Sequence, residues 1–155
     1  MKSFLLLLIT VTISYSCRNN AKQEEEINPK VTLLEADRSF SKLSDEKGMK
    51  AAFIEFIDSN GVLLKPDQLP IAGANAIDYL IQQNDTGFIL TWQPHDGFVA
   101  ASGELGYTYG IYSLKPSGRD TVFYGTYVTI WKKQKNGAWK FVLDSGNEGL
   151  GEKDQ

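Results

Sequence analysis

Aromatic rings and two carboxylates are the side chains of this sequence whose types and spacing could bind or convert a small molecule. The rings recur at every second residue on segments with strand-like patterning. Tyr hydroxyl and Trp indole N–H groups can orient a ligand, while the rings and aliphatic side chains offer it an apolar surface. The predicted pocket residues are Asp37, Phe53, Leu64, Trp92, Tyr109, Tyr127, Trp131 and Asp144.

Each of these residues also has a purely structural interpretation. Tyr and Trp side chains on strands commonly belong to the core or to cross-strand pairs. Asp144 could accept hydrogen bonds in a turn before Ser145-Gly146-Asn147, and Asp37 could face solvent on a helix. The residue pattern alone leaves both interpretations open.

Metal and cofactor chemistry finds no support in the residue types. Cys17 is the only cysteine and His95 the only histidine, so a His/Cys metal site and a Cys–His nucleophile pair are both excluded. His95 lies among residues with turn chemistry, and its simplest interpretation is an exposed turn residue. Gly103-Glu104-Leu105-Gly106 lacks the spacing and the following helix of a phosphate-binding loop. We therefore expect no metal and no cofactor.

Residues 1–16 have the pattern of a secretory signal peptide. Lys2 supplies a positive charge, and the apolar run over residues 4–13 is about half of the roughly 20 residues that span a bilayer. Ser16-Cys17 resembles a bacterial lipobox, in which the cysteine becomes lipidated, although Ser14 stands where that motif usually has an aliphatic residue. The resemblance implies an exported protein of the bacterial cell envelope that is attached to the membrane through Cys17. Cleavage by an ordinary signal peptidase is the alternative.

Composition and charge limit the partners of the remaining chain. Residues 17–29 have almost no apolar content, which predicts a flexible tether. A net charge of -3 without a stripe of Lys and Arg argues against nucleic acid as a partner. The 155 residues, 42% of them hydrophobic, suit one domain with a real core. We expect that domain over residues 30–150, followed by a polar tail at 151–155.

Hydrophobic periodicity predicts the elements that must position the aromatic rings. Helical spacing covers residues 31–43, 49–57 and 73–83. Strands are predicted at residues 62–64, 88–93, 97–102, 106–114, 121–134 and 139–144. Turn chemistry separates them at residues 58–61 and 94–97, and Asn136-Gly137 marks the clearest hairpin. Helices followed by a run of antiparallel strands predict an α+β fold with the helices on one face of the sheet.

The order of these elements, with several local phrases, resembles the nuclear transport factor 2-like superfamily. This superfamily includes ketosteroid isomerase and the SnoaL-like polyketide cyclases, and the nearest resemblance is to its small bacterial domains of unknown function. The residues that carry the resemblance are 34–40, 61–66, 92–94, 103–110, 125–127, 131–134, 137–140 and 143–144. The resemblance implies a cone-shaped fold, in which three N-terminal helices pack on a curved antiparallel sheet, and a homodimer formed through the sheet face.

Departures from the isomerase pattern bear on activity. Lys65 stands before Pro66, at the place where the isomerases carry their carboxylate base. The first helix offers Phe40 and Ser41 where they have an oxyanion-donating Tyr. Isomerase chemistry needs both groups, so that particular activity is disfavoured.

Three functions remain open from the sequence. The first is an envelope lipoprotein that binds a small apolar or aromatic molecule without turnover, and it is the one we prefer. The second is a SnoaL-like acid–base enzyme that uses Asp144 or Asp37. The third is a dimerising interaction module with no ligand. An enzyme should have a buried carboxylate of raised pKa in its pocket, a binder an open and mostly apolar cavity, and an interaction module a large apolar patch on the outer sheet.

Overall fold

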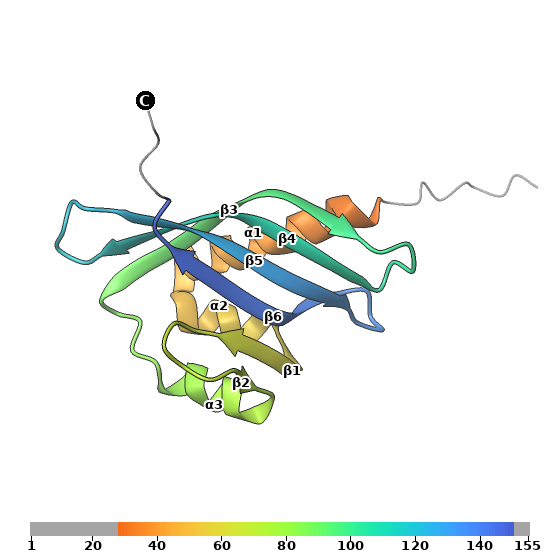
Figure 1. Ribbon diagram of the computed structural model, residues 1–155, viewed down its shortest axis with the longest axis horizontal. Helices are drawn as coiled ribbons and strands as arrows, with labels where there is room; N and C mark the ends of the chain where they lie inside the picture. The colour runs from red at the N-terminus through yellow and green to blue at the C-terminus, as the bar shows by residue number, and fades with distance from the viewer. Residues whose placement is uncertain (1–27, 151–155) are drawn as a thin grey trace, which may run out of the picture.

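Three helices pack beside a curved six-stranded sheet in the computed structural model of the protein, which describes residues 28–150 (Figure 1). The helices are α1 (Pro29–Lys47), α2 (Met49–Phe56) and α3 (Ala74–Gln82). In the figure α1 and α2 lie behind the strands, while α3 lies against β1 and β2 at one edge of the sheet. This arrangement confirms the α+β class expected from the sequence, with three helices packed on one curved sheet.

The sheet has the order β2-β1-β6-β5-β4-β3. Neighbouring strands are antiparallel except β1 and β6, which run parallel. The strands are β1 (Ile57–Leu64), β2 (Ile71–Ala72), β3 (Phe88–Val99), β4 (Leu105–Pro116), β5 (Phe123–Lys133) and β6 (Trp139–Glu148). The two-residue strand β2 was not predicted, because two residues show no alternation.

Helix α1 begins one residue before the expected domain boundary. The Asn28 side chain accepts a hydrogen bond from the Lys30 backbone N–H at 2.9 Å, and Pro29 occupies the first turn, as in many helix starts. The helix ends at Gly48, whose φ of 89° is easiest for glycine. Two hydroxyls on its buried face, Ser41 and Ser44, donate to backbone carbonyls of β3 and so hold the helix against that strand.

Two segments with turn chemistry lie inside strands, which corrects the prediction of turns there. Residues 58–61 belong to β1 and residues 94–97 to β3, and in each strand the pairing register shifts at that point. Asp58 still makes its local bond, because its Oδ1 accepts from the Asn60 N–H at 2.9 Å. The turn residues therefore produce bulges, with one extra residue in β3 and three in β1, and neither strand reverses direction.

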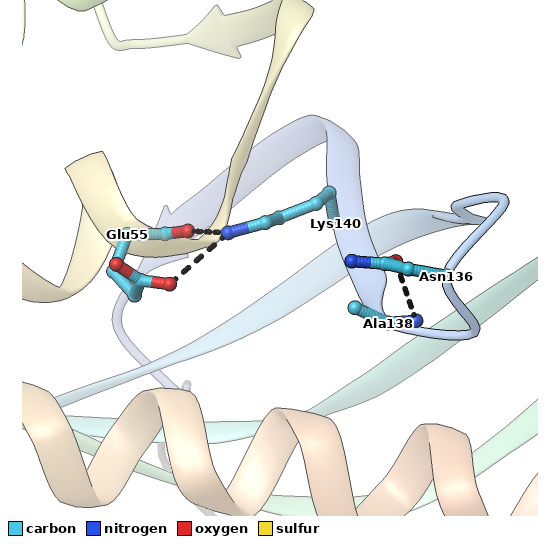
Figure 2. A network of polar contacts seen from close by, with 4 residues as sticks. All are labelled: Glu55, Asn136, Ala138 and Lys140. Carbon is cyan, nitrogen blue, oxygen red and sulfur yellow. Dashed lines mark hydrogen bonds and ion pairs between the residues drawn. The ribbon is translucent and has the colours of Figure 1, made fainter.

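The predicted hairpin at Asn136-Gly137 is confirmed, since β5 and β6 pair antiparallel on either side of it. Asn136 Oδ1 accepts from the Ala138 N–H at 3.1 Å, an Asx-type bond typical of such turns (Figure 2). Figure 2 also shows Lys140 reaching from β6 to the backbone oxygen and the carboxylate of Glu55 on α2. The hairpin is thereby fastened to the helical layer.

Aromatic rings fill the core between the helices and the sheet. Phe40 lies at the centre, with the rings of Phe53, Trp131 and Phe141 at centroid distances of 4.8, 5.9 and 5.5 Å. Trp131 and Phe141 have no exposed surface, and the Trp131 indole donates to Thr108 Oγ1 at 2.8 Å. This cluster is the rigid base on which the neighbouring cavity is built.

Candidate functional site

A cavity of about 170 Å³ lies beside the aromatic core, between α2, the end of β1 and the concave face of the sheet. Each surrounding element contributes side chains because alternate residues of a strand point to the same face. Most of the lining is apolar or aromatic. The lining residues are Phe53, Leu64, Lys65, Pro66, Leu90, Trp92, Tyr112, Leu114, Tyr127, Thr129, Asp144, Ser145, Gly146 and Glu148.

Asp144 is the buried carboxylate of this cavity, with 8% of its surface exposed. Its Oδ2 accepts a hydrogen bond from Thr129 Oγ1 at 3.0 Å, the one side-chain hydrogen bond that Asp144 makes within residues 28–150. Burial raises the pKa of Asp144, while the positive charge of Lys65 and the Thr129 bond oppose that rise. Asp144 is therefore a carboxyl group that can hold a proton in an apolar pocket.

Asp37 lies behind the cavity wall and fixes two of its rings. Its oxygens accept from the Trp92 indole N–H at 2.7 Å and from the Tyr127 hydroxyl at 2.8 Å. Asp37 itself has no exposed surface, and burial raises its pKa against the effect of these bonds. Burial and the nearby Asp37 charge also raise the pKa of Tyr127, so this hydroxyl stays protonated and donates. The network orients both aromatic rings toward the cavity.

Five of the eight predicted pocket residues line the cavity, and a sixth, Asp37, supports two of them. Those five are Phe53, Leu64, Trp92, Tyr127 and Asp144. The other two are corrections. Trp131 belongs to the closed core, and Tyr109 lies on the opposite face of the sheet, with 42% of its surface exposed.

The pairing of β4 with β5 explains the error at Tyr109. Gly110 pairs with Tyr127, so the β4 residues that share the face of Tyr127 are Thr108, Gly110 and Tyr112. Tyr112 lines the cavity and was missed, as was Thr129. Alternation within each strand was visible in the sequence, but which residues share a face depends on a register that the sequence does not reveal.

Solved structures place this geometry in a known fold. One similar structure is a nuclear transport factor 2-like protein with a cystatin-like fold from Novosphingobium aromaticivorans, with a TM-score of 0.62, 15% identity, and coverage of 79% of this chain and 82% of that one. Another is a ketosteroid isomerase-like protein from Erwinia carotovora atroseptica, with a TM-score of 0.58, 13% identity, and coverage of 74% and 92%.

A third similar structure is a computationally designed binder of 17-OHP, with a TM-score of 0.56, 15% identity, and coverage of 78% and 95%. The chain has the nuclear transport factor 2-like fold. No protein-family model and no curated protein matches the sequence.

Within this nuclear transport factor 2-like chain, Lys65 lines the cavity at the end of β1. Its Nζ lies 5.3 Å from the centroid of the Phe53 ring. A second hollow shares Lys65 with the cavity, together with Leu64, Pro66 and the end of β6. Lys65 is thus a cation that lines both the cavity and the adjoining hollow.

The outer face of the same sheet carries exposed apolar side chains on β3, β4 and β5, at the end of the sheet away from β2. They lie on neighbouring strands, since Phe98 pairs with Tyr107 and Tyr109 with Val128. We call this set the outer patch: Phe98, Tyr107, Tyr109, Ile111 and Val128, each at least 36% exposed. Exposed apolar side chains gathered on one face are typical of interaction surfaces.

The described part of the chain has neither a cluster of metal-ligating side chains nor a helix that could span a membrane. No group of three or more His, Cys, Asp or Glu side chains among residues 28–150 is arranged to hold a metal ion. No helix in that range is long and apolar enough to cross a bilayer. Cys17 and the signal-peptide pattern before it lie outside the described residues.

Proposed function

We propose that this protein binds a small, largely apolar molecule in the cavity beside its aromatic core. Size supports a compact ligand, since an apolar cavity of about 150 Å³ accommodates benzene and this one measures about 170 Å³. A single aromatic ring with one polar substituent matches this volume, and a larger ligand would extend into the adjoining hollow. The designed binder of 17-OHP, which has a similar fold, supports the idea that this architecture can be adapted to hold a ligand.

The observation that carries this proposal is that the mostly apolar cavity contains a carboxyl group with unused hydrogen-bonding capacity, while the buried polar groups around it are paired. Within residues 28–150, no buried side-chain nitrogen or oxygen lacks a hydrogen-bond partner. Asp144 makes a single side-chain hydrogen bond there, to Thr129, and lines the cavity with its carboxyl group. Carboxylate oxygens can accept more bonds than that, so Asp144 has capacity for a polar substituent of the ligand.

A variant that fills the cavity tests the proposal. Gly146 lines it, and a Cβ added there would lie 3.4 Å from Tyr112 Cε1, an ordinary contact. We expect Gly146→Leu to fold and to lose binding of one-ring probes such as benzyl alcohol, measured by isothermal titration calorimetry. Thr126→Leu, on an exposed position of β5, is the matched control and should bind as the parent does. Binding that survives in Gly146→Leu would contradict the proposal.

Asp144 supports a second candidate, an acid–base enzyme. A buried carboxyl of raised pKa facing a cavity is what such an enzyme needs. Turnover separates the two functions, because a binder returns its ligand unchanged. Products that form with the parent chain and not with Asp144→Asn, at equal binding, would favour the enzyme.

The outer patch supports a further proposal, that two copies associate through this face. An isologous dimer would bring the patch of one copy onto the same patch of the other. The residues involved lie on the face opposite the cavity, so dimerisation and ligand binding are compatible.

We also propose attachment to the cell envelope through lipidated Cys17, on the strength of the sequence pattern. Expression in a bacterium with radiolabelled palmitate should label the parent chain and leave Cys17→Ala unlabelled. Equal labelling of both chains would contradict the proposal.

A further inference from the structure

Lys65 is the charged side chain of the cavity that binding of an apolar molecule alone leaves unexplained. It is the one cationic residue among those that line the cavity in the described part of the chain. The ion pairs within residues 28–150 join Lys30 to Asp96, Lys42 to Glu46 and Lys140 to Glu55, and Lys65 Nζ makes no side-chain hydrogen bond in that range. An ammonium group that lies beside an aromatic ring and has no anionic partner can bind an anion.

Asp144 complements Lys65 from the neighbouring strand of the same cavity wall, since Asp144 of β6 pairs with Leu63 of β1. The Lys65 charge acts on the Asp144 carboxyl, yet the two groups form no ion pair within 4.0 Å. A protonated Asp144 would present an O–H donor, because a neutral carboxyl group can donate as well as accept. The cavity can therefore offer two donors to a single oxygen-bearing group placed between them.

The aromatic lining indicates what the rest of such a ligand contains. Trp92 and Tyr127 are held by Asp37 with their rings in the cavity wall, and Phe53 forms the floor beneath Lys65. Flat apolar surfaces favour a ring by stacking or edge contact. A cationic group placed beside Asp144 would face the Lys65 ammonium, whereas Glu148, the other charged residue of the lining, lies four residues farther along β6.

We propose that the ligand is a compact aromatic acid whose carboxylate lies between Lys65 and a protonated Asp144, with its ring against Trp92 and Tyr127. This inference rests on the proposed binding function and deepens it by naming the ligand class. Where Asp144 is ionised in the free protein, binding takes up one proton at that carboxyl. The acid itself binds as its anion, and no covalent bond forms or breaks.

Three one-ring probes test the charge preference: benzoate, benzyl alcohol and benzylamine, each titrated calorimetrically into the purified full chain. We expect benzoate to bind more tightly than benzylamine by about tenfold or more. Lys65→Met should remove that advantage, while the affinity for benzyl alcohol, which carries no charge, should fall much less than the affinity for benzoate. Lys65 is partly exposed, so the variant is expected to fold, which a thermal melt checks. Lys132→Met, on an exposed position of β5, is the matched control.

Proton uptake gives a second, independent readout. Benzoate affinity of the parent should fall as pH rises, approaching tenfold per pH unit over the range in which Asp144 is ionised in the free protein but protonated in the complex. Asp144→Asn keeps a donor and should bind benzoate with little pH dependence. The polar and titratable groups that line the cavity near Asp144 or act on its charge all remain in the variant: Thr129 and Tyr127 on β5, Tyr112 on β4, Lys65 after β1, Glu148 on β6 and, behind the wall, Asp37 on α1.

The outcomes separate this inference from the proposed function. Binding of benzyl alcohol or benzylamine that equals or exceeds binding of benzoate would overturn the ligand class and leave the binding function standing. Benzoate affinity unchanged in Lys65→Met would do the same. If none of the three probes binds, both the inference and the proposed function fail.

Discussion

At the scale of single residues, Trp131 and Tyr109 show how differently two aromatic side chains of one sheet can contribute to the stability of the fold. Trp131 has no exposed surface, packs against Phe40 and Phe141, and satisfies the Thr108 hydroxyl. Trp131→Ala should lower the free energy of unfolding by about 3–5 kcal/mol, since it leaves a large cavity. Tyr109→Ala on the outer face should cost about 1 kcal/mol or less. Urea unfolding measures both, and equal losses would contradict this account of the core.

Asp144 should make the protein less stable as pH rises, which is the opposite of the effect of a carboxyl group whose pKa is lowered on folding. Its pKa is raised on folding by burial, so above pH 4 the native state binds more protons than the unfolded one. The unfolding free energy then decreases as pH rises toward the folded pKa, by about 1.4 kcal/mol for each pH unit between the folded and unfolded values. Asp37 adds a slope of the same sign, because its pKa is raised too.

The variant Asp144→Asn removes the Asp144 share of that slope. Relative to the parent, we expect it to be more stable at pH 9 than at pH 5, by urea unfolding at both values. Asp58 and Asp96, whose pKa values are lowered, act in the opposite sense, and only below about pH 4. A difference between parent and variant that is identical at pH 5 and pH 9 would contradict this prediction, because it would show that Asp144 adds no pH dependence over that range.

At the scale of elements, the bulge in β3 depends on a close approach by its neighbour. Gly110 of β4 pairs with Pro94, just before the register shifts, and a Cβ there would overlap the Gln93 carbonyl oxygen. We therefore expect Gly110→Ala to destabilise the protein by about 1–3 kcal/mol. Gly87→Ala, whose Cβ would meet nothing within 4 Å, should change stability by about 0.5 kcal/mol or less. Similar thermal melts for the two variants would contradict this.

The same bulges show where sequence-based prediction of the fold stops. Helical periodicity identified all three helices, and Asn136-Gly137 identified the hairpin, because both signals are local. Residues 58–61 and 94–97 carry equally local turn chemistry, yet neighbouring strands continue the pairing past them. Whether a turn residue reverses a strand or bulges it depends on partners distant in sequence.

The candidate site was predictable to the same extent. Side chains such as Trp92, Tyr127 and Asp144 stand out by type, and they do line one cavity. Tyr112 stands out equally by type, but its place on the cavity face follows from the pairing of β4 with β5. In the sequence, Lys65 was notable only as a departure from the isomerase pattern. Its position in the cavity lining could not be predicted without the structure.

At the scale of the whole molecule, the outer patch predicts a dimer in solution. The parent chain should have the mass of two copies in light scattering at micromolar concentration. The double variant Tyr109→Glu and Ile111→Glu should have the mass of one, because it places charges in the centre of the patch. Phe123→Glu is the control: Phe123 is 51% exposed but has the strand parity of Tyr127, so it belongs to the other face. A monomeric parent would contradict the dimer.

The parallel pairing of β1 with β6 has a consequence for the order in which the molecule can assemble. Strand β1 is formed by residues 57–64, yet apart from the two-residue strand β2 its only sheet neighbour is the last strand of the domain. A chain emerging from the ribosome therefore leaves Phe40 and Phe53 without their contacts to Phe141 until β6 has been synthesised. Contacts of such wide sequence separation close slowly. We therefore expect the domain to remain unfolded until β6 has been synthesised. Until then the nascent chain can still pass through a narrow channel.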